Sequence, residues 1–114
     1  MRPEEDRLRD MQDAIAAIRS RVTTDRTAFD TDPLIRVWCL HHIMIIGEAA
    51  AGLPDEFRQR HPTVPWREIV GMRNAIVHGY FDVDWEAVWA VEERELDPLK
   101  EAIESILRSE GEEP

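Results

Sequence analysis

The sequence has little cysteine, few glycines and no long uncharged apolar run. Its one cysteine, Cys39, excludes a disulfide framework within the chain and fits a reducing compartment, so we expect a cytoplasmic protein. The first residues, MRPEEDRLRD, carry charges of both signs where a signal peptide would need an apolar segment. The most apolar stretch, VWCLHHIMIIG, is short and holds two histidines, which predicts a buried helix rather than a membrane span.

Length and composition predict one globular domain. A chain of 114 residues buries roughly two-thirds of its unfolded surface, which suffices for one core and leaves no room for a second domain. Apolar residues make up 43% and charged residues 33%, a balance typical of globular proteins. We expect the domain to span residues 1–108 and residues 109–114 to form an acidic, frayed tail.

Periodicity predicts an all-α fold. Apolar residues recur at spacings of three and four in several segments, and proline followed by acidic residues marks helix starts. The sequence shows no convincing strand pattern or internal repeat. The predicted helices cover about residues 3–22, 33–51, 54–60, 65–78 and 84–107, with a kink or restart at 97–98. Four or five amphipathic helices with short links indicate an up-and-down bundle.

The formal net charge of −10 weighs against nucleic-acid binding, because lysine and arginine supply most of the non-specific affinity for phosphate. The charge is uneven, however: residues 82–114 carry twelve acidic and three basic side chains, whereas residues 1–81 carry twelve and eleven. Between residues 57 and 80 the balance is positive. Besides Arg73, this window holds three candidate phosphate contacts: Arg58, Arg60 and Arg67.

The segment RNAIVHGY, residues 73–80, concentrates groups that could do chemistry. Residues four apart stack on one helical face, so Asn74 and His78 are neighbours, whereas Arg73 is offset from His78 by about 140°. In a purely structural interpretation, Arg73 is a solvated cation, Asn74 and His78 satisfy each other, and Tyr80 packs on the end of the bundle. Spacing alone leaves this interpretation and a functional one open.

Read as Arg-x-x-x-x-His-x-Tyr, the residues Arg73, His78 and Tyr80 match the motif of the HEPN superfamily. The segments IIGEAA, LPDEFRQRHPTVPWREIVGMRN and VHGYFDVDWEAVW resemble the HepT-type ribonuclease toxins in particular. Asn74 matches the Arg-Asn pair usual there, and the similarity extends over about residues 7–107. The resemblance implies an all-α bundle that dimerises through its motif-bearing helices.

The same resemblance implies metal-independent cleavage of RNA, tRNA or mRNA, with no cofactor. His78 is then the general acid or base, Arg73 holds the scissile phosphate, Asn74 orients the histidine or the phosphate, and Tyr80 positions the RNA backbone. The products carry a 2′,3′-cyclic phosphate. Arg58, Arg60 and Arg67 become candidate contacts for RNA phosphate.

The resemblance also implies a partner, a minimal nucleotidyltransferase that serves as antitoxin in a type VII-like toxin–antitoxin pair. In some members of the family it transfers AMP to the motif tyrosine, here Tyr80. Negative charge added there would occupy the place of the RNA phosphate.

Two other functions stay open at this stage. In the first, the chain is a non-catalytic nucleotide- or RNA-binding companion of a nucleotidyltransferase, and Arg73 and His78 hold phosphate without cutting. In the second, it is a structural adaptor, and the motif residues tolerate substitution. Loss of cleavage with retained RNA binding in His78→Ala distinguishes the enzyme from the binding companion.

The remaining polar candidates favour structural roles. His41 and His42 lie about 100° apart on their helix and cannot share a metal as an i,i+4 pair could, and His61 lies in a link, so no metal site is expected. Gly47 permits close helix packing and Glu48 is a lone acid near a helix end, where either could support the motif helix.

Overall fold

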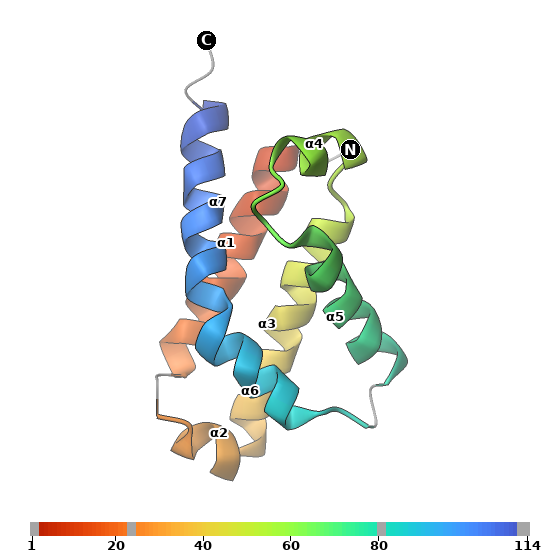
Figure 1. Ribbon diagram of the computed structural model, residues 1–114. Coiled ribbons are helices and arrows are strands. Elements are labelled where there is room, and N and C mark those ends of the chain that lie inside the picture. The colour runs from red at the N-terminus through yellow and green to blue at the C-terminus, as the bar shows by residue number, and fades with distance from the viewer. Residues whose placement is uncertain (1–2, 23–24, 80–81, 112–114) are drawn as a thin grey trace.

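The computed structural model describes residues 3–22, 25–79 and 82–111, and within them the chain forms helices and loops without a strand. This confirms the predicted all-α bundle, whose elements Figure 1 shows. The helices are α1 (Glu4–Arg21), α2 (Thr27–Thr31), α3 (Pro33–Ala51), α4 (Asp55–Arg60), α5 (Trp66–His78), α6 (Trp85–Arg94) and α7 (Leu96–Gly111).

The structure contains more helices than the apolar periodicity of the sequence predicts. The short helix α2 has no periodic apolar pattern of its own, and it is held by the burial of Phe29. The last predicted helix is two helices, α6 and α7, that part at Glu95 rather than at the following Asp97-Pro98. Because α7 continues to Gly111, residues 109–111 of the predicted tail are helical, and residues 112–114 lie outside the described residues.

Two helix starts follow the expected capping chemistry. The Asp32 side chain accepts a hydrogen bond from the backbone N–H of Leu34 at 3.0 Å, directly before the proline that opens α3. The Asp84 side chain accepts one from the N–H of Ala87 at 3.2 Å, at the start of α6. A side chain that accepts from a free N–H of the first turn typically stabilises a helix by about 1 kcal/mol.

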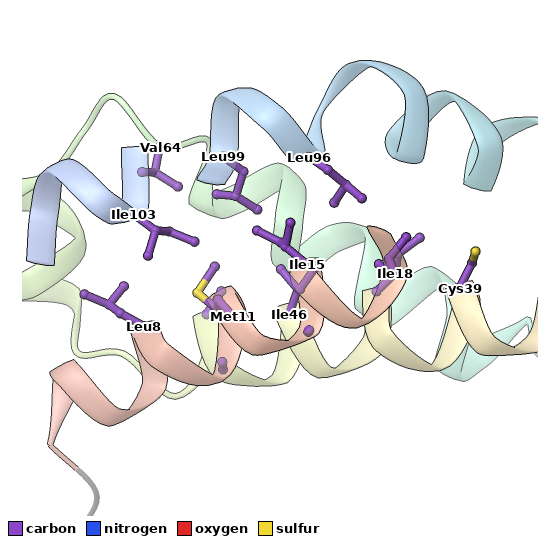
Figure 2. Packing of buried hydrophobic residues seen from close by; sticks show 14 of the residues in the cluster. Leu8, Met11, Ile15, Ile18, Cys39, Ile46, Val64, Leu96, Leu99 and Ile103 are labelled. Atoms are coloured by element: carbon purple, nitrogen blue, oxygen red, sulfur yellow. The ribbon is translucent and has the colours of Figure 1, made fainter. Parts of the chain in front are cut away.

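The core lies where α3, α1 and α7 meet. Figure 2 shows Leu8, Met11 and Ile15 of α1 beside Leu99 and Ile103 of α7. All five side chains are buried. Full burial of one such aliphatic side chain contributes about 1.5–3 kcal/mol, so this layer supplies much of the stability of the bundle.

One helix, α3, is long and apolar enough to cross a membrane by length and composition alone. The helix still carries two charged side chains, Arg36 and Glu48, and the uncharged stretch between them is the apolar segment that the sequence predicted to be a buried helix. The central helix of a bundle passes the same test. Here α3 packs against α1, α2, α5 and α6, and Leu40, Ile43 and Ile46 are among its buried side chains.

A buried ion pair connects α1 with α6. Arg19 contacts the carboxylate of Glu92, donates to the backbone carbonyl of Glu92 at 3.1 Å and donates to Asp97 at 3.0 Å. The Glu92 side chain is only 1% exposed. Burial raises its pKa above the ordinary value, and Arg19 opposes that shift. The pair therefore fixes how α1 meets the junction of α6 and α7.

Candidate active site

The helix α5 carries the motif residues and packs mainly on α3. Its inner face buries Ile76 and half-buries Met72, while its outer face is exposed. At Gly47 of α3 the two helices come unusually close. A Cβ added to Gly47 would lie 2.2 Å from the Cβ of Arg73, so only glycine fits at this crossing. The backbone of α3 thereby fixes the base of the Arg73 side chain.

Arg73 is held by two neighbours. Its Nε and Nη2 atoms contact Oε1 of Glu48, and its Nη1 donates to Oδ1 of Asn74 at 2.7 Å. A guanidinium has five N–H donors, of which these contacts use three. The Arg73 side chain remains 29% exposed, and its two other N–H groups have no partner among the described residues. The site thus holds a fixed cation with donors to spare.

His78 lies in the last turn of α5, which closes with a hydrogen bond of 2.9 Å from the N–H of Gly79 to the carbonyl of Ala75. The imidazole is exposed and forms no hydrogen bond, ion pair or ring contact with any described residue. The structural interpretation had Asn74 and His78 satisfy each other. In the structure the Asn74 side chain binds Arg73 instead, and both ring nitrogens of His78 have no partner among the described residues.

Tyr80, the fourth predicted site residue, lies outside the described residues. Its predicted roles in positioning RNA and in accepting AMP therefore stay predictions. What the structure brings together is Arg73 and Asn74, with His78 exposed one turn beyond Asn74 on the same helix.

The three other predicted arginines differ in their surroundings. Arg58 pairs with Asp55 at 2.6 Å. Arg60 lies 3.5 Å from Glu110 and over the ring of Phe57. Arg67 is exposed and has no partner among the described residues. The positive balance of this window is thus partly neutralised in the folded chain.

Arg58 and Arg67 line the same surface hollow as Asn74, and Arg60 does not. Arg67 is therefore part of the motif helix itself, and the fold brings Arg58 of α4 next to that helix.

Gly47 and Glu48, for which the sequence indicated supporting roles, both touch Arg73. Sequence reasoning missed the bond between Arg73 and Asn74, because helical spacing places residue 74 beside residue 78 and says nothing of side-chain rotamers. The signal available in the sequence was Gly47 followed by Glu48, a small residue and an acid near the end of the helix that packs on the motif helix.

The other histidines have separate structural contacts. His42 donates through Nδ1 to the carbonyl of Trp38 at 2.8 Å, and Nε2 of His61 lies 2.8 Å from Glu110. The latter contact lowers the pKa of Glu110 below its ordinary value. No group of three His, Cys, Asp or Glu side chains comes together within the part of the chain that the structure describes.

The structure is thus a helical bundle in which one packed helix, α5, carries an exposed histidine and a fixed arginine. The sequence model described as Ribonuclease HepT-like matches residues 11–106. The chain therefore belongs to the HepT-like ribonuclease family.

Individual relatives agree with this assignment. A protein named "Probable ribonuclease HepT" from Thermococcus cleftensis is 32% identical over 108 residues, which cover 92% of this chain and 96% of the relative. A protein of Caldanaerobacter subterraneus subsp. tengcongensis named as a candidate RNase is 39% identical over 82 residues, or 72% and 73% of the two chains. Another candidate RNase, from Methanocaldococcus jannaschii, is 33% identical over 72% and 75%. No solved structure matches the chain significantly.

Proposed function

We propose that this protein is the toxin component of a type VII-like toxin–antitoxin pair and that it cleaves RNA without a metal ion. One observation carries the proposal. The helix α5 carries both Arg73, whose guanidinium is held by two neighbouring side chains, and His78, whose imidazole has no partner among the described residues. The two residues are five positions apart, which is about 7.5 Å along the helix axis and about 140° around it. One phosphodiester can therefore contact both from adjacent flanks of the helix, or from two copies of the helix across a dimer axis.

RNA supplies its own nucleophile, so acid–base groups and a cation suffice. A base removes the proton of the 2′-hydroxyl, the oxygen attacks phosphorus, and the bond to the 5′-oxygen breaks as an acid protonates that oxygen. The products are a 2′,3′-cyclic phosphate and a 5′-hydroxyl. Imidazole suits both proton transfers because it exchanges protons near neutrality. The spare N–H groups of Arg73 stabilise the charge that develops on the phosphate oxygens.

Asn74 has two roles in this scheme. Its Oδ1 accepts from Arg73 and thereby orients the guanidinium toward the outer face of α5. Its amide N–H groups have no partner among the described residues and can donate to a phosphate oxygen.

One imidazole cannot serve as base and acid in the same step, and we infer that a second copy of the chain supplies the other. Three large apolar side chains stay exposed on α3 and α5 within the described residues, Leu34 at 79%, Val37 at 53% and Val77 at 43%. A dimer through these helices would cover them and bring two His78 side chains to one cleft. Aliphatic surface of this kind favours association in water.

A minimal nucleotidyltransferase is the proposed antitoxin, and transfer of AMP to Tyr80 is the proposed mode of neutralisation. The test is incubation of the purified pair with ATP and intact-mass analysis. A mass gain of one AMP that disappears in Tyr80→Phe supports the modification, whereas an unchanged mass with persistent neutralisation assigns inhibition to binding alone.

The cleavage chemistry is tested with matched oligonucleotides in excess EDTA. The RNA form should be cut to products with cyclic-phosphate ends, and the same sequence with a 2′-deoxyribose at the cleaved position should stay intact there. Cleavage of the deoxy form at that position would refute the role of the 2′-hydroxyl. Binding of RNA without cleavage of any RNA would favour the non-catalytic companion instead.

A further inference from the structure

A surface hollow of about 730 Å³ lies between α4 and the outer face of α5. Its lining includes Arg58 and Gln59 from α4 and Arg67, Gly71 and Asn74 from α5. Because Asn74 also binds Arg73, the hollow begins at the candidate active site and leads away from it. We call it the α4–α5 groove.

Three of the α5 residues that line this groove, Arg67, Gly71 and Asn74, form a straight row that His78 continues beyond the lining. Arg67, Gly71, Asn74 and His78 follow one another at spacings of four, three and four, which places them on the same helical face. All four are exposed. The row is about 16 Å long at 1.5 Å per residue, so it extends well beyond the single phosphodiester that is cleaved.

Gly71 lies in the middle of this row, and no contact among the described residues requires a glycine there. Its φ is not positive, and a Cβ added to it would meet no atom within 4 Å. Gly47, by contrast, is required by the contact with Arg73. Glycine in an exposed helix interior costs stability relative to alanine, and one use of such a position is the close approach of a ligand to the backbone. The floor of the groove is therefore open to a ligand that lies directly on the helix.

Charge indicates what that ligand is. Arg67 is exposed at the far end of the row and has no ion-pair partner among the described residues, although the chain as a whole has a net charge of −10. Arg58 and Asp55 also line the groove and pair with each other at 2.6 Å, so Arg67 is the charged group of the lining that no described residue neutralises. An arginine without a partner among the described residues of an acidic protein favours an anionic ligand. The distance of Arg67 from His78 along α5 favours a ligand that carries several phosphates in a row.

We propose that the α4–α5 groove binds the single strand of RNA that flanks the scissile phosphate, with a neighbouring phosphate on Arg67 and the backbone passing over Gly71. The proposal rests on the ribonuclease function proposed above. A single strand fits because a groove along one helix can follow a flexible backbone, as positively charged channels for single-stranded nucleic acids do. Arg67 and Gly71 are then binding residues for the flanking RNA rather than catalytic residues.

The experiment uses the purified full chain and two RNA substrates, a dinucleotide that reaches only the catalytic groups and a single strand of about 12 nucleotides that also fills the groove. The variants are Arg67→Ala and Gly71→Gln, whose side chain would occupy the open floor. Gly71→Ala adds one methyl group in open space and should raise the melting temperature, which shows that the position tolerates a side chain. Arg94→Ala, which removes a 75% exposed arginine on α6, is the matched control for lost charge.

The proposal predicts that Arg67→Ala and Gly71→Gln weaken binding of a non-cleavable 2′-O-methyl form of the longer strand about tenfold. They should lower kcat/KM for the cleavable longer strand by a similar factor and leave dinucleotide cleavage unchanged. In Arg67→Ala the slope of log affinity against log salt should fall by about one. If the variants cleave each substrate as fast as the control and the wild type do, the groove assignment is wrong, whereas the proposed ribonuclease activity is unaffected. Loss of dimerisation in light scattering with loss of both cleavages would assign the groove to a protein interface instead. If the wild-type chain cleaves neither substrate, the proposed ribonuclease function itself is refuted.

Discussion

The crossing of α3 and α5 at Gly47 gives a sharp test of how the fold positions Arg73. In Gly47→Ala the new Cβ would lie 2.2 Å from the Cβ of Arg73 and 2.9 Å from its Cγ. Carbon atoms in contact lie about 3.5–4.0 Å apart, so α5 would have to move away by about 1.3 Å or more. The atom that it meets belongs to the base of the side chain and cannot swing aside without its backbone.

Two effects on stability oppose each other in this variant. Alanine gains about 1 kcal/mol over glycine in a helix interior, and overpacking costs about 1–3 kcal/mol, so the net loss is about 0–2 kcal/mol. Activity should suffer far more. A displacement of about 1 Å at a catalytic group can lower the rate about 100-fold. We therefore expect a folded protein with strongly reduced RNA cleavage.

Urea unfolding and initial rates of RNA cleavage check the two effects on the same preparation. Gly52→Ala is the matched control, because the three atoms nearest to its added Cβ all belong to the end of the Arg7 side chain, which can move aside. The control should keep wild-type activity. Gly47→Ala with wild-type activity and stability would refute the claim that the helix crossing positions Arg73.

Three further predictions concern other contacts. Glu48→Ala should lower kcat about 10- to 100-fold with a smaller change in KM, because Arg73 loses the anchor for its guanidinium, and Glu48→Gln should recover part of the loss in steady-state kinetics. Arg19→Ala should cost about 3–5 kcal/mol at neutral pH, because it leaves Glu92 charged and unpaired in the core. Since the pKa of Glu92 is raised in the folded state, that cost should shrink as the pH falls through it, and a cost that does not depend on pH in urea unfolding would contradict the assignment. Leu34→Asp should disrupt the proposed dimer in analytical ultracentrifugation and lower cleavage together with dimer content, so an active monomer would refute the proposed shared site.

The helices and their starts were predictable because their signals are local. Asp32 and Asp84 each precede a helix that they cap, and apolar spacing identified the faces of α1 and α5. The short helix α2 was not predictable, since one buried aromatic, Phe29, holds it in place and five residues carry no periodicity.

The candidate site was predictable in its residues but not in its contacts. The placement of Arg73 and His78 on one helix follows from their spacing. The contact of Gly47 with Arg73 depends on how two helices cross, which joins residues far apart in the chain. The pairing of Asn74 with Arg73 rather than His78 depends on rotamers, and no sequence pattern encodes those.

The central claim is that His78 transfers protons during RNA cleavage by this chain. The most direct measurement compares the initial rate of cleavage of one RNA in excess EDTA by wild type, His78→Ala and His78→Gln, with circular dichroism to confirm the fold. Since a positioned acid or base contributes about 10²–10⁴-fold, we predict that both variants lose at least about 100-fold in rate and keep their affinity for a non-cleavable RNA. Wild-type cleavage by His78→Ala, with the same cyclic-phosphate ends, would contradict the account.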